Sequence, residues 1–229
     1  MSTRIPGLFI TGTDTAVGKT YVAALIAREL VAAGHRVGVY KPVASGCRRD
    51  GERIVSGDAV SLWEAAGRPG ELQHVCPQCF LAPLAPHLAA RAEGREVDTE
   101  LLRVGLEYWQ ARSEIILVEG VGGLMSPVSE EDYVADLAEQ FGFPLIVVSR
   151  NALGTINQTL QTLITAATFR EGLPIAGVVL NNPAPSSADA SLSTNRQELS
   201  ARCVPPILAE IPWQADRFDT NVDWFNLAR

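Results

Sequence analysis

A glycine-bearing segment close to residue 12 narrows the folds open to this chain. The segment joins an apolar run, residues 7–10, to a helical pattern over residues 21–33. It reads Gly12, Thr13, Asp14, Thr15, Ala16, Val17, Gly18, Lys19 and Thr20. A strand, such a loop and a helix, in this order, form the context of a nucleotide-phosphate loop. The segment therefore predicts an α/β fold with a phosphate site where the first strand ends.

The chemistry of this loop follows from its backbone and two side chains. N–H groups of the loop and of the helix N-terminus point at one place and favour an anion there. Lys19 can reach the terminal phosphates, and the Thr20 hydroxyl can bind Mg²⁺. The usual pattern has a first glycine separated by four residues from the glycine at position 18, but Thr13 holds that first position and Gly12 precedes it. We therefore expect a deviant phosphate loop, and the weaker alternative is a helix-capping loop that happens to hold a lysine.

Length and charge limit the class of protein. The 229 residues are 47% hydrophobic and 20% charged, enough for one α/β domain with a full core. A formal net charge of −7 disfavours nucleic acid or an acidic membrane surface as the main partner. No apolar run reaches the ~18 residues of a membrane span, and no signal-peptide layout is present. We expect a single globular domain over residues 1–229, located in the cytoplasm.

The cysteines form one short motif. Cys76 and Cys79 flank Pro77 and Gln78 as a lone C-x-x-C, and Cys47 and Cys203 lie apart from it in the sequence. A structural zinc site needs two further ligands at suitable spacing, and a thioredoxin-like motif would follow the first strand. We expect incidental loop cysteines, with a metal or redox role as the weaker alternative.

Apolar runs typical of strands alternate with helical patterns along the chain. The expected strands cover residues 8–11, 37–40, 115–118, 145–148, 176–180 and 207–209. The expected helices cover residues 19–33, 58–65, 85–92, 99–111, 134–141, 155–171 and 190–201. Continuous apolar strands separated by helices predict a mostly parallel sheet with helices on both faces. Residues 183–190 are expected to be a surface loop.

Charged residues follow two of the expected strands, where ligands bind in an open parallel sheet. Glu119 ends the strand at 115–118, and Gly120, Gly122 and Gly123 come next. A carboxylate there would lie near Mg²⁺ held by Thr20, and glycines allow close backbone approach. The alternative is a surface glutamate on a glycine turn.

Lys41 and Ser45 follow the strand at 37–40. The lysine can neutralise phosphate or an anionic intermediate, or it can be a solvated lysine. Asp58 heads the next helical pattern, and the pattern alone favours a helix N-cap over a second Mg²⁺ carboxylate. Thr20, Asp58 and Glu119 would nevertheless make a sensible oxygen set for Mg²⁺.

Two further strand ends carry candidate binding residues. The strand at 145–148 leads into a helix through a loop that makes another candidate anion site, with Leu153, Gly154, Thr155, Ile156 and Asn157. Asn181 follows the strand at 176–180, where an asparagine amide can read a purine edge. An ordinary turn explains that asparagine equally well.

Taken together, these motifs resemble the dethiobiotin synthetase family of the biotin pathway over nearly the whole chain. The matching segments are residues 12–20, 40–46, 118–123, 153–157 and 210–213. The resemblance implies a deviant P-loop NTPase fold and an ATP- and Mg²⁺-dependent cyclo-ligase. That enzyme would convert 7,8-diaminononanoate and CO₂ to dethiobiotin, ADP and phosphate. The route would run through an N-carbamate and a carbamic–phosphoric mixed anhydride.

The resemblance also implies roles for individual residues. The catalytic group would be Lys19, Lys41 and Ser45. ATP would bind the loop from Gly12 to Thr20, with Asn181 and Pro212 near adenine. The diamine would meet Thr15, Lys41, Ser45, Gly122, an apolar wall at residues 80–87, and Leu153, Gly154, Thr155, Ile156 and Asn157 of a partner in a homodimer. Mg²⁺ would bind Thr20, Asp58 and Glu119, which places Asp58 above its N-cap alternative.

Departures from the family pattern and rival functions sharpen the prediction. Ala16 stands where an acidic residue is common, Leu124 replaces a common tryptophan, and the C-x-x-C is not part of the pattern.

A partition-type switch ATPase usually carries a second lysine early in the loop, where this chain has Thr13, Asp14 and Thr15. A related amide-forming synthetase needs a glutamine-hydrolysing domain, and a passive nucleotide-binding module would not need Lys41 and Glu119 together.

Overall fold

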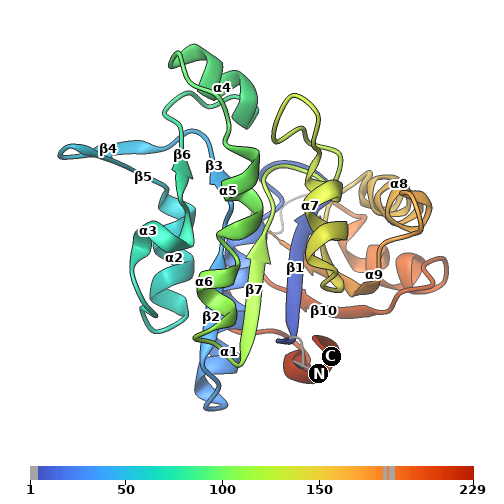
Figure 1. Cartoon of the computed structure of the whole chain (residues 1–229). Coiled ribbons are helices and arrows are strands. Elements are labelled where there is room, and N and C mark those ends of the chain that lie inside the picture. Colours follow the sequence, from blue (N-terminus) through green and yellow to red (C-terminus); the bar gives the residue numbers. More distant parts are fainter. Residues whose placement is uncertain (1–4, 183–184, 186–188) are drawn as a thin grey trace.

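A six-stranded parallel sheet runs through the centre of the molecule (Figure 1). The structure, a computed structural model, describes residues 5–182, 185 and 189–229. The strand order is β10-β9-β8-β1-β7-β2, and every pair in this sheet is parallel. The strands are β1 (Gly7–Gly12), β2 (Val37–Tyr40), β7 (Ile115–Glu119), β8 (Leu145–Arg150), β9 (Ile175–Asn181) and β10 (Ile207–Ile211). Their apolar residues are buried because both faces of the sheet are covered.

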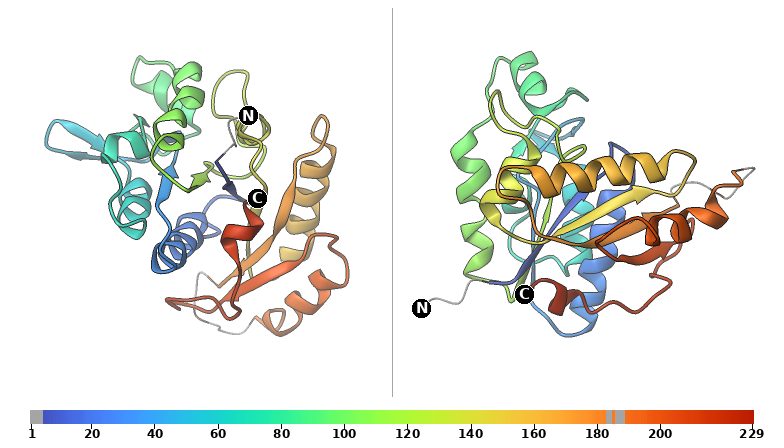
Figure 2. Two further views of the ribbon diagram at one scale, coloured as in Figure 1. Left: turned by 60° about the horizontal axis from the view of Figure 1, so that its bottom comes forward. Right: turned by 90° about the vertical axis from the view of Figure 1, so that its right-hand side faces the viewer.

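Helices lie on both sides of the sheet (Figure 2). On one side α1 (Lys19–Ala32) crosses β1 and β7, with α2 (Gly57–Ala65) and α10 (Trp224–Leu227) packed against α1. On the other side α8 (Thr155–Thr168) covers β8 and α9 (Leu192–Ser200) packs on α8. The helices α5 (Thr99–Val104) and α7 (Val134–Phe141) also contact one another. The predicted fold class, a mostly parallel sheet with helices on both faces, is confirmed.

Short elements that the sequence did not predict lie above the carboxyl ends of β2 and β7. The two-residue strands β3 (Val43–Ala44) and β6 (Gln78–Cys79) pair in parallel, between α3 (Leu72–Val75) and α4 (Pro86–Ala92). The strands β4 (Arg48–Asp50) and β5 (Arg53–Val55) form an antiparallel hairpin that projects from the molecule at the upper left of Figure 1. Ladders this short leave no periodic signal in a sequence.

The prediction of one helix over residues 99–111 is wrong, because the chain forms α5 and then α6 (Glu107–Gln110). The buried Tyr40 hydroxyl lies 3.0 Å from the carbonyl oxygens of both Leu101 and Leu102. In a continuous helix the Leu102 carbonyl would accept from the Leu106 N–H, which bonds to Arg103 instead. A tertiary contact from β2 therefore ends α5.

Other boundaries differ by a few residues. The helix expected over 155–171 ends at Thr168, and the one expected over 190–201 covers Leu192–Ser200. The surface loop expected at 183–190 lies largely outside the described residues. Within residues 5–182, 185 and 189–229, no helix combines the length and apolarity that crossing a bilayer requires.

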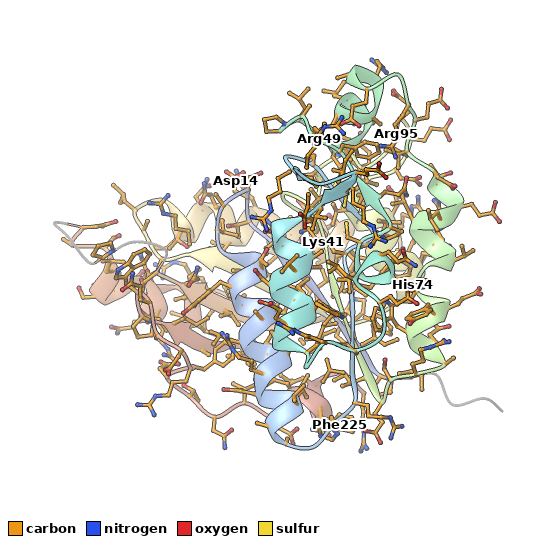
Figure 3. The ribbon with its side chains drawn as sticks, turned by 90° about the vertical axis from the view of Figure 1, so that its left-hand side faces the viewer. Asp14, Lys41, Arg49, His74, Arg95 and Phe225 are labelled. Atoms are coloured by element: carbon orange, nitrogen blue, oxygen red, sulfur yellow. The ribbon has the colours of Figure 1, made fainter. Side chains whose placement is uncertain are left out.

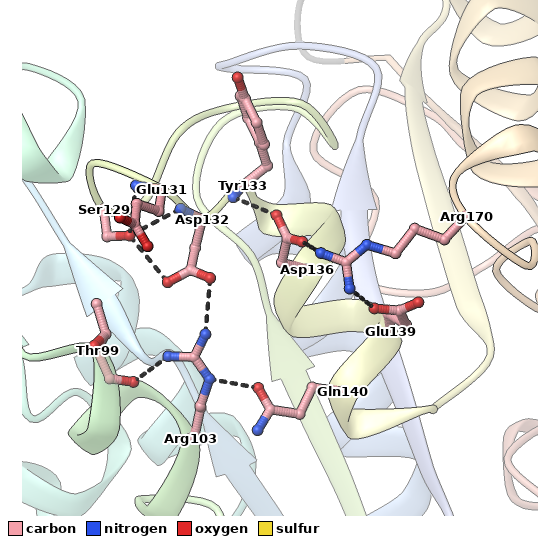
Figure 4. A network of polar contacts seen from close by, with 10 residues as sticks. All are labelled: Thr99, Arg103, Ser129, Glu131, Asp132, Tyr133, Asp136, Glu139, Gln140 and Arg170. Atoms are coloured by element: carbon pink, nitrogen blue, oxygen red, sulfur yellow. Dashed lines mark hydrogen bonds and ion pairs between the residues drawn. The ribbon is translucent and has the colours of Figure 1, made fainter.

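A polar network holds the long connection between β7 and α7 (Figure 4). Arg103 of α5 donates to Asp132 at 2.7 Å and to Gln140 at 2.6 Å. The Asp132 N–H donates back to the Ser129 hydroxyl at 2.9 Å. Asp136 at the start of α7 forms an ion pair with Arg170. These bonds fix the connection that carries the glycines beyond β7.

The core beneath this connection allows a test of the packing. Phe9 is fully buried in the central strand β1, and its ring lies 6.4 Å from that of Phe141. We expect Phe9→Ala to lower the free energy of unfolding by about 3–5 kcal/mol, because it removes the ring and leaves a cavity. Denaturant unfolding measures this change. Val204→Ala is the matched control, since Val204 is 99% exposed. Equal effects of the two variants would contradict the assigned core.

Candidate active site

The loop between β1 and α1 has the form of an anion-binding site. Gly18 is the N-cap of α1 with φ near +96°, a left-handed conformation that favours glycine. No side chain caps α1, so its first N–H groups are available to a ligand. Lys19 folds back over the loop, and its Nζ donates to the Asp14 carbonyl at 3.0 Å. Burial lowers the pKa of Lys19 to about 8, although Glu119 opposes the shift.

A second cluster forms around the carboxylate of Glu119, the last residue of β7. Oε1 of Glu119 accepts from the Thr20 hydroxyl at 2.8 Å and from Lys41 Nζ at 2.7 Å. Lys41 also lies 3.2 Å from Oδ2 of Asp58. The structure therefore brings together Thr20, Lys41, Asp58 and Glu119, which the sequence placed in four separate segments.

The neighbouring carboxylates keep the Lys41 side chain protonated. Burial alone would lower the pKa of Lys41, but the carboxylates of Glu119 and Asp58 outweigh it and raise the pKa above its usual value. The side chains of Lys41 and Glu119 are 3% and 1% exposed, whereas that of Asp58 is 54% exposed. A buried ion pair therefore stands beside a carboxylate that solvent can reach.

The same cluster contains oxygen atoms suited to a hard cation. Oε2 of Glu119 is buried and has no hydrogen-bond partner among the described residues. Thr20 and Asp58 also line a cavity of about 530 Å³ between α1 and α2. A hydroxyl and two carboxylates match the preference of Mg²⁺ for few protein oxygens. These residues fit a magnesium ion by their chemistry and by the unpartnered oxygen.

The N-cap alternative for Asp58 is wrong. Ser56 is the N-cap of α2, and its hydroxyl accepts from the Ala59 N–H at 3.2 Å. Asp58 lies in the first helical turn, and its carboxylate is directed to Lys41. Ser and Asp both suit an N-cap, so sequence spacing alone could not separate two positions within one turn.

The glycines after β7 press against the phosphate loop. A Cβ added to Gly123 would lie 3.5 Å from the Gly12 carbonyl oxygen and 3.7 Å from that of Thr13. One added to Gly122, whose φ is +67°, would lie 3.6 Å from the Thr15 hydroxyl. The loop after β7 therefore lies in contact with the phosphate loop. Close approach of its backbone to a ligand stays a prediction.

The segment from Lys41 to Gly46 is held by the chain around the C-x-x-C. The Lys41 N–H donates to the Val75 carbonyl at 2.7 Å, and the Gly46 N–H donates to Ala82 at 3.0 Å. Ser45 is half-buried, and Gly46 lies against Pro83. Figure 3 shows Lys41 near the middle of the molecule, between Arg49 and Arg95 at one end and Phe225 at the other. The predicted apolar wall at 80–87 thus stands beside Ser45 and Gly46.

The residues predicted to lie near adenine have contacts that the sequence did not reveal. Asn181 is buried, and its Nδ2 donates to the Val17 carbonyl at 2.9 Å, so its amide braces the phosphate loop. Pro212 lines a cavity of about 600 Å³ with Asn182 and Trp213. Glu210 accepts from Nδ2 of Asn182 at 3.1 Å. The end of its strand was the sequence signal for Asn181, and the matching segment at 210–213 was the signal for Pro212.

The start of α8 faces outward. Gly154 is its N-cap, and the Thr155 hydroxyl hydrogen-bonds to that of Ser149 at 2.7 Å inside the fold. Ile156 is half-buried and Asn157 is exposed. Leu153 is 84% exposed. Leu153 and Asn157 are therefore open to solvent.

Comparisons with known proteins place the chain by sequence. A family model described as an AAA domain matches residues 6–218. The ATP-dependent dethiobiotin synthetase BioD of Rhodopirellula baltica is 44% identical over 215 residues, covering 89% of this chain and 82% of that protein. BioD of Anaeromyxobacter dehalogenans strain 2CP-C is 44% identical over 210 residues, covering 92% and 91%.

Solved structures support the fold alone, because their sequences are distant. A plasmid partition protein of Borrelia burgdorferi, solved with AMPPNP, superposes with a TM-score of 0.56 at 12% identity and covers 99% of this chain and 95% of that one. The signal recognition particle receptor FtsY of Elizabethkingia anophelis gives 0.53 at 10% identity. The match spans 99% of this chain and about 65% of the receptor chain. The fold is that of P-loop NTPases, and by its sequence relatives the chain belongs to the dethiobiotin synthetase family.

Proposed function

We propose that this chain, an ATP-dependent ligase by family, is a Mg²⁺-dependent cyclo-ligase that forms dethiobiotin, ADP and phosphate from 7,8-diaminononanoate, CO₂ and ATP. One observation carries the proposal: Lys19, Lys41 and Glu119 converge where β1, β2 and β7 end. Phosphoryl transfer depends mainly on positioning and charge stabilisation, and this arrangement supplies both.

The phosphate loop would hold the nucleotide. N–H groups of residues 13–20 would surround the β-phosphate, and Lys19 would turn from the Asp14 carbonyl toward the γ-phosphate. Thr20, Asp58 and Glu119 would hold Mg²⁺. When bound, Mg²⁺ neutralises charge on the β- and γ-phosphate oxygens. Asn181 would keep the Val17 carbonyl turned away from the phosphates, because its amide already binds that oxygen.

Lys41 and Ser45 would act on the carbamate. An amine of the diamine takes up CO₂ and loses a proton to give the carbamate. The carbamate oxygen attacks the γ-phosphorus of ATP, the bond from that phosphorus to the ADP oxygen breaks, and ADP leaves as the mixed anhydride forms. The second amine then attacks the carbamoyl carbon, closes the ureido ring and expels phosphate. The protonated Lys41 would stabilise the carbamate and the transferring group, and the Ser45 hydroxyl would donate to the same anion.

A homodimer would complete the diamine site. Ile156, Leu160 and Ile164 follow helical spacing along α8, and Leu153 comes just before its N-cap. Leu153 is 84% exposed and Ile164 is 62% exposed. A second copy covering this stripe would bring the α8 N-terminus to the substrate carboxylate, which suits an anion.

The direct test is phosphate release from Mg·ATP and bicarbonate, with and without 7,8-diaminononanoate. We expect release that depends on the diamine and equals dethiobiotin formed, because a ligase couples the two. Mass spectrometry of the product provides the second readout. Release that ignores the diamine would favour a partition-type switch ATPase instead.

Lys41→Met tests the proposed charge stabilisation. We expect turnover at saturating substrates to fall by about 10²–10³, because one preorganised donor to the transition state is lost. The control is Arg36→Met, which removes an exposed cation paired with Glu114. An unchanged rate in the Lys41 variant would remove this residue from the chemistry.

Ile164→Asp tests the dimer. A charge in the centre of an apolar interface should shift the protein to monomers in sedimentation and reduce turnover, while the fold seen by circular dichroism persists. Val204→Asp, at an exposed apolar position outside α8, should leave the dimer intact. Dimers of equal stability in both variants would contradict the assigned surface.

A further inference from the structure

The two thiols of the C-x-x-C and the distant thiol of Cys47 gather beside the β3–β6 ladder. The Cys79 thiol donates to Sγ of Cys76, with the two sulfur atoms 3.6 Å apart. Cys47, three residues beyond the end of β3, interacts with Cys79. Across the part of the chain that the structure describes, no group of three or more His, Cys, Asp or Glu residues is arranged to hold a metal ion. Redox chemistry is therefore the chemistry open to these thiols.

The residues on either side of the C-x-x-C, Val75 and Phe80, form backbone hydrogen bonds with the segment that carries Lys41 and Ser45. Cys79 is the register partner of Ala44. The Phe80 N–H donates to the Ala44 carbonyl at 2.9 Å, and the Cys47 N–H donates to Phe80 at 2.9 Å. On the other side, the Lys41 N–H donates to Val75 at 2.7 Å. Movement of residues 76–79 therefore reaches residues 41–47 through these bonds.

We propose that Cys76 and Cys79 form a reversible dithiol–disulfide site for small-molecule disulfides, and that closing it displaces the segment 41–47. The redox site stands on the geometry of the two sulfurs. The effect on turnover rests on the proposed function, because it concerns Lys41 and Ser45.

The chemistry balances as two thiol–disulfide exchanges. The Cys79 thiolate attacks a small-molecule disulfide, forms a mixed disulfide and releases one thiol. The Cys76 sulfur then attacks Sγ of Cys79, closes the protein disulfide and releases the second thiol. The protein loses two electrons and two protons, and the reagent gains them as two thiols.

Closure requires a real displacement. The sulfur atoms must approach from 3.6 Å to about 2.05 Å, a movement of about 1.5 Å. Gln78 between them is anchored, because its Nε2 donates to the Asp98 carbonyl at 2.9 Å and its Oε1 accepts from the Asp98 N–H at 2.8 Å. The shift therefore falls on the cysteines themselves and on the β3 strand beside Cys79.

The environment of the thiols makes the exchange slow at neutral pH. The hydrogen bond from Cys47 lowers the pKa of Cys79, but the bond to Cys76 and burial raise it, for a net pKa of about 12. The contact with Cys79, followed by burial, raises the pKa of Cys47 above its usual range. The rate of oxidation should rise about tenfold per pH unit below 12, as the Cys79 thiolate fraction rises.

The experiment treats the full-length protein with glutathione disulfide at alkaline pH and maps the peptides by mass. We expect a disulfide between Cys76 and Cys79, reversed by dithiothreitol. Hydrogen exchange at the Lys41 and Cys47 amides should be faster in the oxidised form, because their bonds to Val75 and Phe80 are disturbed. Turnover should fall about tenfold or more, since a misplacement of about 1 Å can cost 10²-fold.

Two variants separate the outcomes. Cys79→Ser should abolish the disulfide and keep turnover constant through the treatment, whereas Cys203→Ser should behave like the unaltered protein. A bond between Cys47 and Cys79, or no bond at all, would overturn the redox site. A Cys76–Cys79 disulfide with unchanged hydrogen exchange would overturn the displacement. Peptide mass mapping and amide hydrogen exchange do not depend on catalysis. A failure of the proposed function would therefore show only as absent turnover in the reduced protein.

Discussion

The buried carboxylate of Glu119 is the contact on which the site depends. Removed from water, a carboxylate needs hydrogen bonds and opposite charge, or it destabilises the fold. Here Thr20 and Lys41 satisfy one oxygen, and Lys41 links it to Asp58. Three loops that follow different strands are thereby drawn to one point before any ligand arrives. The second oxygen has no partner among the described residues and gives the cluster its capacity for a cation.

The sequence predicted the parts of the site that obey local rules. The strand, loop and helix spacing located Lys19 and Thr20, and the strand-end rule located Lys41 and Glu119, because β2 and β7 are parallel neighbours. It could not predict that Asn181 braces Val17, since that bond joins residues 164 positions apart.

The other features that the sequence did not predict have the same physical origin, contacts between residues far apart in the chain. A side chain from β2 ends α5, and a two-residue ladder gathers the thiols of Cys47, Cys76 and Cys79. Neither contact has a local periodicity. Ser56 and Asp58 are both good N-cap residues within one turn, so only the observed bond to Ala59 separates them. Contacts between distant residues set the ends of helices and the positions of these side chains, whereas the local sequence pattern sets where helices and strands form.

The hairpin of β4 and β5 has a practical consequence. It occupies the stretch between the segment ending at Cys47 and the N-cap Ser56, its residues are mostly exposed, and its tip at Gly51 has open space around it. The two strands pair mainly with each other, so length added at the tip would be absorbed there. Exposed loop tips of this kind tolerate insertion well. A small fluorescent or affinity module placed at Gly51 would stand clear of the core and of the six-stranded sheet.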